Sequence, residues 1–282
     1  MNRRTFVLSA SAATLAAKPF PKPLGVQIYT ARTILPKDPE GTLKRIADIG
    51  YKEVELFAYP QLNELVPIVN KLGMRAISMH LPMPLVTGNW GDQTPIDLQQ
   101  FLSGAKAAGL SYVGMPYVAP AERKEFSALA AKMNKTGEAV SKAGMTFFYH
   151  NHAFEFAGKP GERVIDKFKK ELDPKLVKLE MDIFWVAAGG SDPVAFLEEW
   201  RGRVALMHVK DKSRDMGTVE TESQAKPADF KEVGTGTLDI PKILKTALKT
   251  GVDKFFVEQD QCPGDPIDSL KLSFENLKKM SF

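Results

Sequence analysis

Short apolar runs alternate with longer amphipathic runs along the chain after Pro23. Eight of the short runs have the length and composition of β-strands, and they cover residues 24–29, 51–57, 74–79, 111–115, 145–149, 177–181, 204–209 and 254–257. The runs that follow them repeat apolar positions at helical spacing, and these cover 42–49, 62–72, 95–108, 121–143, 164–171, 193–200, 240–248 and 266–280. Four helical runs stop at a glycine, which readily takes the left-handed conformation that ends a helix, at Gly50, Gly73, Gly109 and Gly144.

Each predicted strand is followed by a helix before the next strand begins. Such strict alternation favours parallel strands, because the helix returns the chain to the edge where the strand started. Eight strand–helix units in about 260 residues fit a closed (β/α)8 barrel better than an open sheet. We therefore predict an α/β protein with one TIM-barrel domain over residues 24–282. The one long irregular stretch, residues 212–236, follows the seventh strand, and loops of that length are usually functional.

The composition is that of an ordinary globular protein, with 44% hydrophobic and 26% charged residues. The net charge is +4, but lysine and arginine are spread along the chain without a run of five like charges. This pattern indicates a solvated surface and argues against a nucleic-acid partner. The single cysteine, Cys262, excludes a disulfide within the chain. A homo-oligomer is compatible with the composition but is not indicated by it.

The first 23 residues are expected to be a targeting signal and not part of the barrel. Arg3 and Arg4 precede Phe6, a weakly apolar stretch covers residues 7–17, and a proline-rich break covers 18–23. As a helix, 7–17 would rise only about 16 Å, whereas a membrane core is about 30 Å thick. We expect a twin-arginine-type export signal and a periplasmic mature protein without a stable membrane anchor. A basic tail is the alternative.

All four histidines of the chain stand at the ends of predicted strands, namely His80, His150, His152 and His208. In a parallel barrel the carboxyl ends of the strands meet at one face, where such barrels hold their active sites. Neutral imidazole nitrogens and carboxylate oxygens can converge there on one ion. A mixed shell without thiolate suits Mn²⁺, Co²⁺, Mg²⁺, Fe²⁺ or Zn²⁺. The clustering therefore predicts one divalent metal ion.

Acidic residues at the ends of the sixth and eighth strands supply the carboxylates. Neighbouring residues on a strand point to opposite faces, so Glu180 and Asp182 share a face, as do His208 and Lys210. We favour Asp182, His208 and Glu258 as metal ligands. Three alternatives stay open. Glu180 could lie deeper in the barrel and pair with a base, Asp182 could cap a helix that follows its strand, and Glu258 could form a salt bridge at the end of its strand.

The chain also resembles a known family over nearly its whole length after residue 23. It looks like the xylose-isomerase-like barrel superfamily, and in particular like the proteins described broadly as sugar phosphate isomerase/epimerase. The segments that carry the resemblance are GVQIYTAR (25–32), VELF (54–57), YHNHAFEF (149–156), MDIFWVAAGG (181–190), RVALMHVKD (203–211), VGTGTLDIPKIL (233–244) and FFVEQD (255–260). The HVKD and VEQD motifs are fairly specific.

The resemblance implies a set of four metal ligands. In this superfamily they are an acid or histidine from the fifth strand, an aspartate from the sixth, a histidine from the seventh and a glutamate from the eighth. Asp182, His208 and Glu258 match the last three. At the fifth strand this chain has His150 where many epimerases of the family have a glutamate. We take His150 as the fourth ligand and His152 as its alternative.

The resemblance further implies a sugar isomerase or epimerase that forms an enediolate next to a metal-bound carbonyl. Glu258 then acts as the base, with Glu55 or His152 as its counterpart, and Lys210 stabilises the oxyanion. Gln27 and His80 are expected to bind substrate hydroxyls. Aromatic residues at the strand ends could stack on sugar faces, namely Tyr29, Phe57, Trp90, Phe184 and Trp185.

The sequence gives little sign of a phosphate site, since only Gly234-Thr235-Gly236 resembles a glycine-rich cradle. We therefore expect a free or oxidised keto-sugar or a glycoside as the small-molecule substrate. A metal-dependent lyase or dehydratase is the nearest alternative, because it shares the enolate chemistry. A sugar-binding barrel without catalysis is the alternative outside enzymes. An apurinic endonuclease with three zinc ions needs more histidines than the four present.

Overall fold

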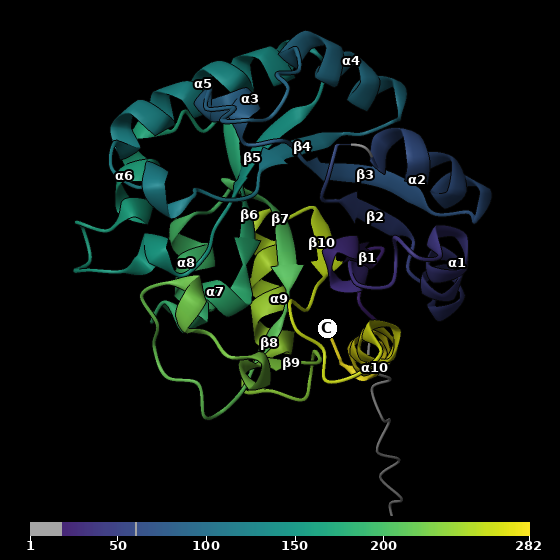
Figure 1. Ribbon diagram of the computed structural model, residues 1–282. Coiled ribbons are helices and arrows are strands. Elements are labelled where there is room, and N and C mark those ends of the chain that lie inside the picture. The colour runs from purple at the N-terminus through teal and green to yellow at the C-terminus, as the bar shows by residue number, and fades with distance from the viewer. Residues whose placement is uncertain (1–18, 60) are drawn as a thin grey trace, which may run out of the picture.

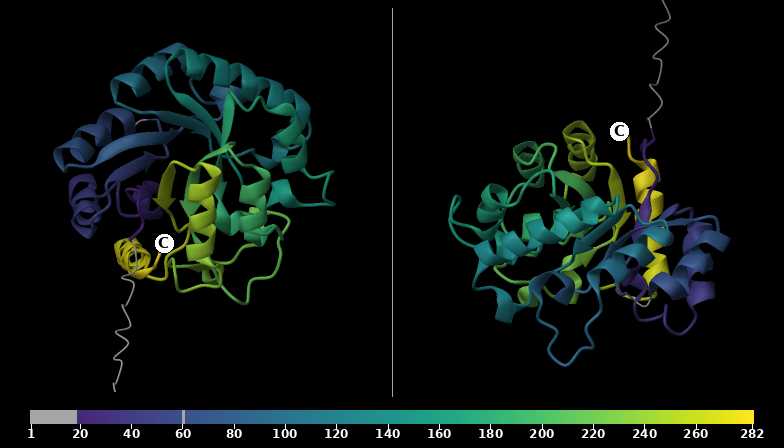
Figure 2. Two further views of the ribbon diagram at one scale, coloured as in Figure 1. Left: turned by 180° about the vertical axis from the view of Figure 1, so that it is seen from behind. Right: turned by 90° about the horizontal axis from the view of Figure 1, so that it is seen from above.

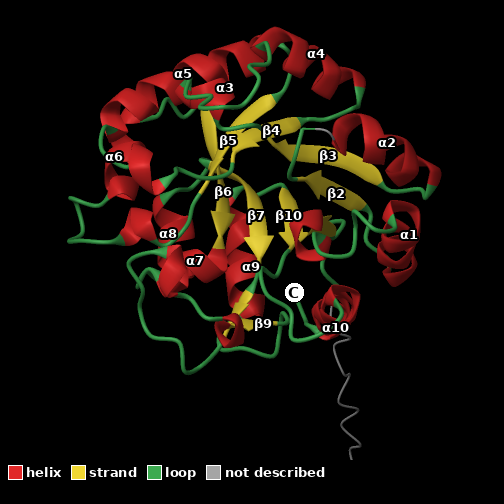
Figure 3. Cartoon of the chain, in the orientation of Figure 1, coloured by secondary structure: helices red, strands yellow, loops and turns green. Residues whose placement is uncertain are grey.

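In the computed structural model, which describes residues 19–59 and 61–282, eight parallel strands close into a barrel with helices around it (Figures 1 and 3). Their order around the barrel is β1-β10-β7-β6-β5-β4-β3-β2. The barrel strands are β1 (Gly25–Gln27), β2 (Glu53–Leu56), β3 (Arg75–His80), β4 (Tyr112–Met115), β5 (Thr146–His150), β6 (Val177–Asp182), β7 (Val204–Val209) and β10 (Lys254–Val257). This arrangement confirms the predicted single-domain (β/α)8 TIM barrel.

The helices that return the chain between strands lie where the apolar spacing predicts them. They are α1 (Pro39–Ile49), α2 (Gln61–Lys71), α4 (Leu98–Ala107), α5 (Phe126–Lys142), α6 (Val164–Glu171), α8 (Pro193–Glu199), α9 (Ile240–Thr250) and α10 (Pro266–Lys279). Aspartate side chains accept backbone N–H groups at the starts of five of them, at Asp38, Asp97, Asp192, Asp239 and Asp265. The four predicted glycine stops all have positive φ, between 72° and 119°.

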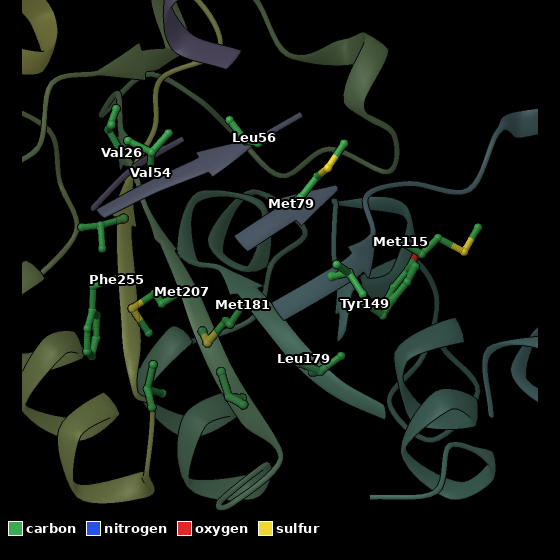
Figure 4. Packing of buried hydrophobic residues seen from close by; sticks show 14 of the residues in the cluster. Val26, Val54, Leu56, Met79, Met115, Tyr149, Leu179, Met181, Met207 and Phe255 are labelled. Carbon is green, nitrogen blue, oxygen red and sulfur yellow. The ribbon is translucent and has the colours of Figure 1, made fainter. Parts of the chain in front are cut away.

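The alternation along each strand separates an apolar shell from a polar interior. On β6, Leu179 and Met181 belong to the buried apolar cluster between strands and helices, which Figure 4 shows from close by. Glu180 and Asp182, on the opposite face of the same strand, point into the barrel. A smaller apolar cluster fills the barrel below the polar residues and consists of Ile77, Phe148, Leu206 and Phe256. The barrel therefore has an apolar plug and a polar upper layer at its C-terminal end.

Some elements differ from the sequence-based prediction. The predicted helix over 121–143 begins only at Phe126, after a short 3-10 turn at 120–122. Two short helices were not predicted, α3 (Pro84–Thr87) and α7 (Ile183–Ala188). Helix α7 has five of its six residues buried, so it lacks the polar face that makes a helix visible in a sequence.

The long irregular stretch after β7 contains a small antiparallel pair, β8 (Asp211–Lys212) and β9 (Phe230–Lys231). The carboxylate of Asp211 holds the far end of this stretch, because it accepts hydrogen bonds from the backbone N–H groups of Gly234, Gly236 and Leu238. One buried acid therefore fixes the loop over the C-terminal face of the barrel.

The start and the end of the described chain lie side by side (Figure 2). The ring of Phe20 contacts those of Phe255 and Phe282 at centroid distances of 4.9 and 5.0 Å. The predicted export signal falls mostly on residues 1–18, which lie outside the described residues, so export stays a prediction. Within residues 19–59 and 61–282, no helix has the length and apolar character needed to cross a membrane.

Candidate metal centre and active site

Four side chains from four neighbouring strand ends meet inside the barrel: His150, Asp182, His208 and Glu258. The Nε2 atom of His150 lies 3.0 Å from Nδ1 of His208 and 3.4 Å from Oδ2 of Asp182. The Nδ1 atom of His208 lies 2.8 Å from Oε2 of Glu258. One nitrogen or oxygen from each residue lies within 4.8 Å of the others. We call these four residues the ligand group.

The chemistry of the ligand group fits a divalent metal ion. Nitrogen and oxygen ligands stand about 2.0–2.2 Å from such an ion, which puts neighbouring ligand atoms roughly 3–4 Å apart. The spacings above match this. The Oδ2 atom of Asp182 is buried and faces positive or ionisable groups, with Nζ of Lys210 at 2.8 Å and Nε2 of His150 at 3.4 Å. The Nδ1 atom of His150 faces the carbonyl of Pro116 at 3.2 Å, which leaves a lone pair on Nε2 toward the group.

A carboxylate behind His208 orients the ring of this histidine. The Nε2 atom of His208 lies 2.7 Å from Oε1 of Glu55, so an N–H on Nε2 leaves Nδ1 bare for a metal. Glu55 is itself held by Nε2 of Gln27 at 2.7 Å and by the hydroxyl of Ser78. Burial and the neighbouring Glu180 raise the pKa of Glu55 to about 7. Gln27 and Glu55 are fully buried beneath the ligand group and do not line the pocket described below.

A second acidic group lies deeper in the barrel and shares His208 with the ligand group. It consists of Glu55, His80, Glu180 and His208. The Nε2 atom of His80 lies 2.8 Å from Oε2 of Glu180. Although burial opposes ionisation, His208 and His80 hold the pKa of Glu180 well below its usual range. Glu180 therefore lies deeper in the barrel and pairs with a base, as one of the open alternatives held.

Lys210 brings a buried positive charge to the ligand group. Its Nζ atom lies 2.8 Å from Oδ2 of Asp182, 2.6 Å from Oε2 of Glu258 and 2.7 Å from Oδ2 of Asp260. Although burial opposes the charged form, the three carboxylates hold the pKa of Lys210 well above its usual range. The side chain is therefore an ammonium, and it contacts two of the oxygens that the ligand group offers.

Asp182 has two structural roles at once. Its Oδ1 atom accepts a hydrogen bond from the backbone N–H of Trp185 at 3.1 Å and so caps α7. Its Oδ2 atom belongs to the ligand group. The capping alternative and the ligand prediction are therefore compatible, because each uses a different oxygen.

A cavity of about 490 Å³ opens above the ligand group at the C-terminal face. His80, His150, His152, Trp185, Lys210 and Glu258 are the predicted site residues that line it. The loop over 212–236 contributes Glu222, Ala225, Pro227 and Phe230. Of the five predicted aromatic residues, Tyr29, Phe57 and Trp185 line this cavity, whereas Phe184 is buried against Phe230. Arg32, Tyr117 and Asp260 also line it, and sequence reasoning did not single them out.

His152 stands beside the ligand group with a free nitrogen. Its Nδ1 atom is buried without a hydrogen-bond partner among the described residues. Its ring lies 4.8 Å from that of His150 and 5.0 Å from that of Tyr117, measured between centroids. Burial and the neighbouring His150 hold the pKa of His152 well below its usual range. His152 is therefore held in its neutral form.

Glu155 gives a test of the electrostatics around His152, because it accepts the backbone N–H of that residue at 2.9 Å. Burial raises the pKa of Glu155 from 4.5 to about 8. A carboxyl with a raised pKa in the folded state makes the free energy of unfolding fall as the pH rises through this window. We expect Glu155→Gln to lose less stability than the wild type between about pH 5 and pH 8 in urea unfolding. Equal losses in both proteins would contradict the buried, protonated carboxyl.

Comparison with known proteins shows which proteins the chain resembles. Among curated proteins, the inosose dehydratase of Clostridium tetani is 25% identical over 154 residues, which are 51% of each chain. The chain thus spans about half the length of the curated relatives it matches. A solved sugar phosphate isomerase/epimerase from Parabacteroides distasonis has a TM-score of 0.72 at 25% identity and covers 96% of this chain and 98% of its own.

A more distant solved structure shares the fold. The 3-keto-D-glucoside 4-epimerase from E. coli has a TM-score of 0.63 at 13% identity, over 91% of this chain and 98% of its own. The model of one family, described as xylose isomerase-like TIM barrel, matches residues 43–280. The chain therefore belongs to the xylose isomerase-like TIM barrel family.

Proposed function

We propose that the chain is a divalent-metal-dependent sugar isomerase or epimerase that acts on a carbonyl-bearing sugar or glycoside. One observation carries the proposal: two imidazoles and two carboxylates with metal-ligand spacing lie together at the end of the barrel, and two of them, His150 and Glu258, line a pocket that also holds a neutral histidine. The similarity to a sugar phosphate isomerase/epimerase and the shared fold with a keto-glucoside epimerase support it.

The residues of the pocket have separate tasks in this proposal. A bound divalent ion would polarise the substrate carbonyl and so acidify the neighbouring C–H. Either of two unprotonated groups that line the pocket, His152 or Glu258, can accept the proton from that carbon and return it. Return from the other group, after it has taken a proton from solvent, would invert the carbon. The ammonium of Lys210 stabilises negative charge on the substrate oxygen. Glu55 acts as a positioning residue, because it touches His208 and does not line the pocket.

The proposed substrate carries no phosphate, because the groups that would bind one are already engaged. The backbone N–H groups of Gly234 and Gly236 both donate to Oδ2 of Asp211, so the glycine-rich turn is filled by a carboxylate of the chain itself. Arg32 donates to two backbone carbonyls, and Lys210 contacts three carboxylates. Neither cation that lines the pocket is therefore free to form the paired hydrogen bonds with which a phosphate is usually held.

A metal-dependent lyase is the second candidate function, favoured by the similarity to inosose dehydratases over about half the chain. The two reactions share proton removal next to a carbonyl. They differ in the next step, since a lyase expels a group from the neighbouring carbon whereas an epimerase returns the proton.

Proton exchange with solvent tests the function and separates the two candidates. The purified protein with Mn²⁺ or Zn²⁺ is incubated in D₂O with keto-glucosides and free ketoses, and the sugars are followed by NMR. We expect deuterium next to the carbonyl at least about 10³-fold faster than with chelated protein, since metal polarisation contributes several kcal/mol. Loss of water or of the glycosidic group instead would identify a lyase. No exchange and no elimination across the panel would contradict both.

A further inference from the structure

A second cavity, of about 340 Å³, adjoins the metal pocket on the side of β2 and β3. The two cavities share Phe57 and His80 as a common wall. The second cavity is otherwise lined by residues from the segments after β2 and β3, namely Ala58, Tyr59, Leu81, Pro82, Trp90, Gln93, Thr94 and Ile96. The two cavities therefore adjoin at Phe57 and His80.

The lining of the second cavity suits an uncharged group. None of the described residues that line it is an aspartate, glutamate, lysine or arginine. The metal pocket differs sharply, because Arg32, Lys210, Glu222, Glu258 and Asp260 all line it. The ionisable His80 also lines this cavity, but its Nε2 atom already contacts Oε2 of Glu180 at 2.8 Å. A charged group placed in the second cavity would therefore lose hydration without gaining a free ionic partner, which is costly. The second cavity therefore selects against phosphate and carboxylate groups.

Three aromatic side chains make the second cavity suited to a ring. Phe57, Tyr59 and Trp90 line it, while Gln93 and Thr94 add polar groups at exposed positions. Flat ring faces pack against other apolar ring faces, and such contacts contribute more than the buried area alone. A mainly apolar lining with a few polar groups is also the usual composition of small-molecule sites.

The aromatic wall of the second cavity is held in place by the chain itself. Backbone N–H groups of Phe57 and Ala58 donate to Oε1 of Gln61 at 3.0 and 3.1 Å. The ring of Phe57 packs edge-on against Tyr29 at 5.3 Å, and the ring of Tyr59 packs on Phe101 at 5.5 Å. These contacts form the aromatic wall before any ligand arrives, which lowers the entropy cost of binding.

We propose that this cavity binds a second, uncharged ring of the substrate, while the reacting sugar ring lies over the ligand group. The substrate is then a glycoside with a ring as its non-reacting part, either a second sugar or an aromatic aglycone. The inference rests on the proposed function for the identity of the reacting ring. The cavity itself, its uncharged lining and its aromatic wall do not depend on that function.

Binding of unreactive glucosides tests the subsite without any catalysis. Methyl β-D-glucopyranoside, phenyl β-D-glucopyranoside and cellobiose are titrated into chelated wild-type protein and into Trp90→Ala, and saturation-transfer NMR gives each Kd. We expect Trp90→Ala to raise the Kd of the two-ring ligands by about 5- to 30-fold and that of the methyl glucoside by less than about 2-fold. Phe282→Ala is the matched control, since its ring lies outside both cavities and should change none of the three.

The outcomes identify the second ring or overturn the proposal. A Trp90 effect on the phenyl glucoside alone identifies an aromatic aglycone, and an effect on cellobiose alone identifies a second sugar. Equal Kd values for all three ligands, or two-ring Kd values unchanged in Trp90→Ala, overturn the subsite. Should Trp90→Ala fail to fold, Tyr59→Leu repeats the test on the same wall. Deuterium exchange is measured separately, so failed exchange with a Trp90 effect on binding refutes the proposed reaction and leaves the subsite standing.

Discussion

Replacing Asp182 by asparagine is expected to remove metal binding and with it the proton exchange. Asparagine keeps an oxygen for the N–H of Trp185, so the cap of α7 survives, but it removes the charge next to His150 and Lys210. Loss of a partner outside the ligand shell already costs about 10- to 100-fold in metal affinity, so loss of a ligand should cost more. We expect exchange to fall by at least about 10³-fold.

Metal content after dialysis, calorimetry with Mn²⁺ and the exchange rate measure these effects. Glu53→Gln is the matched control, because Glu53 is a buried carboxylate of the same barrel that pairs with Arg75 and Lys254 and has no place in the ligand group. The control should keep full metal content. Unchanged metal stoichiometry in Asp182→Asn would show that the ligand group does not hold the ion.

The sequence predicts the barrel well because its signal is local and repeated. Each amphipathic run followed by a glycine marks one helix end, and the four glycines at Gly50, Gly73, Gly109 and Gly144 all have the expected positive φ. The side on which each strand ends follows from this alternation, since parallel strands in a closed barrel have their carboxyl ends on one face. That constraint places Asp182, His208 and Glu258 at one face, whereas the choice of His150 over His152 as the fourth ligand came from the family resemblance.

Depth along the barrel axis is what the sequence does not give. The side chains of Gln27 and Glu55 point into the barrel, as expected, but they lie below the ligand group. There Gln27 donates a hydrogen bond to Glu55 and accepts one from the backbone N–H of Tyr29, and Glu55 contacts His208. Their predicted contacts with substrate or proton stay untested. The alternation of side chains along a strand shows whether a residue points into or out of the barrel. Its position along the barrel axis depends on the stagger between neighbouring strands.

The adjoining cavity also lies beyond sequence reasoning. Trp90 falls in an irregular segment between α3 and α4, where no periodicity places its ring relative to Phe57 or Tyr59. The pattern of the chain marks Trp90 only as an aromatic residue after a strand. Its position in a wall next to the metal pocket follows from the path of the backbone, which tertiary packing decides.

Lys210 poses the sharpest question about the charges of the site, because its buried ammonium is shared by three carboxylates. Asp182, Glu258 and Asp260 each have an oxygen within 2.8 Å of Nζ, and two of them belong to the ligand group. Removing one partner of a buried ion pair typically costs about 3–5 kcal/mol, since the remaining charge is left uncompensated. We therefore expect Lys210→Met to lower the free energy of unfolding of chelated protein by about 3–5 kcal/mol.

A metal ion at the ligand group would offset part of that loss, because it places another positive charge on Asp182 and Glu258. Urea unfolding of Lys210→Met with chelator and with saturating Mn²⁺ measures the difference, and the variant should gain more from the metal than the wild type does. Lys44→Met is the control, since its pair with Asp48 is exposed and such pairs contribute only about 0.2–1 kcal/mol. If Mn²⁺ stabilises both proteins equally, Lys210 and the metal do not share these carboxylates, and the ion binds elsewhere in the barrel.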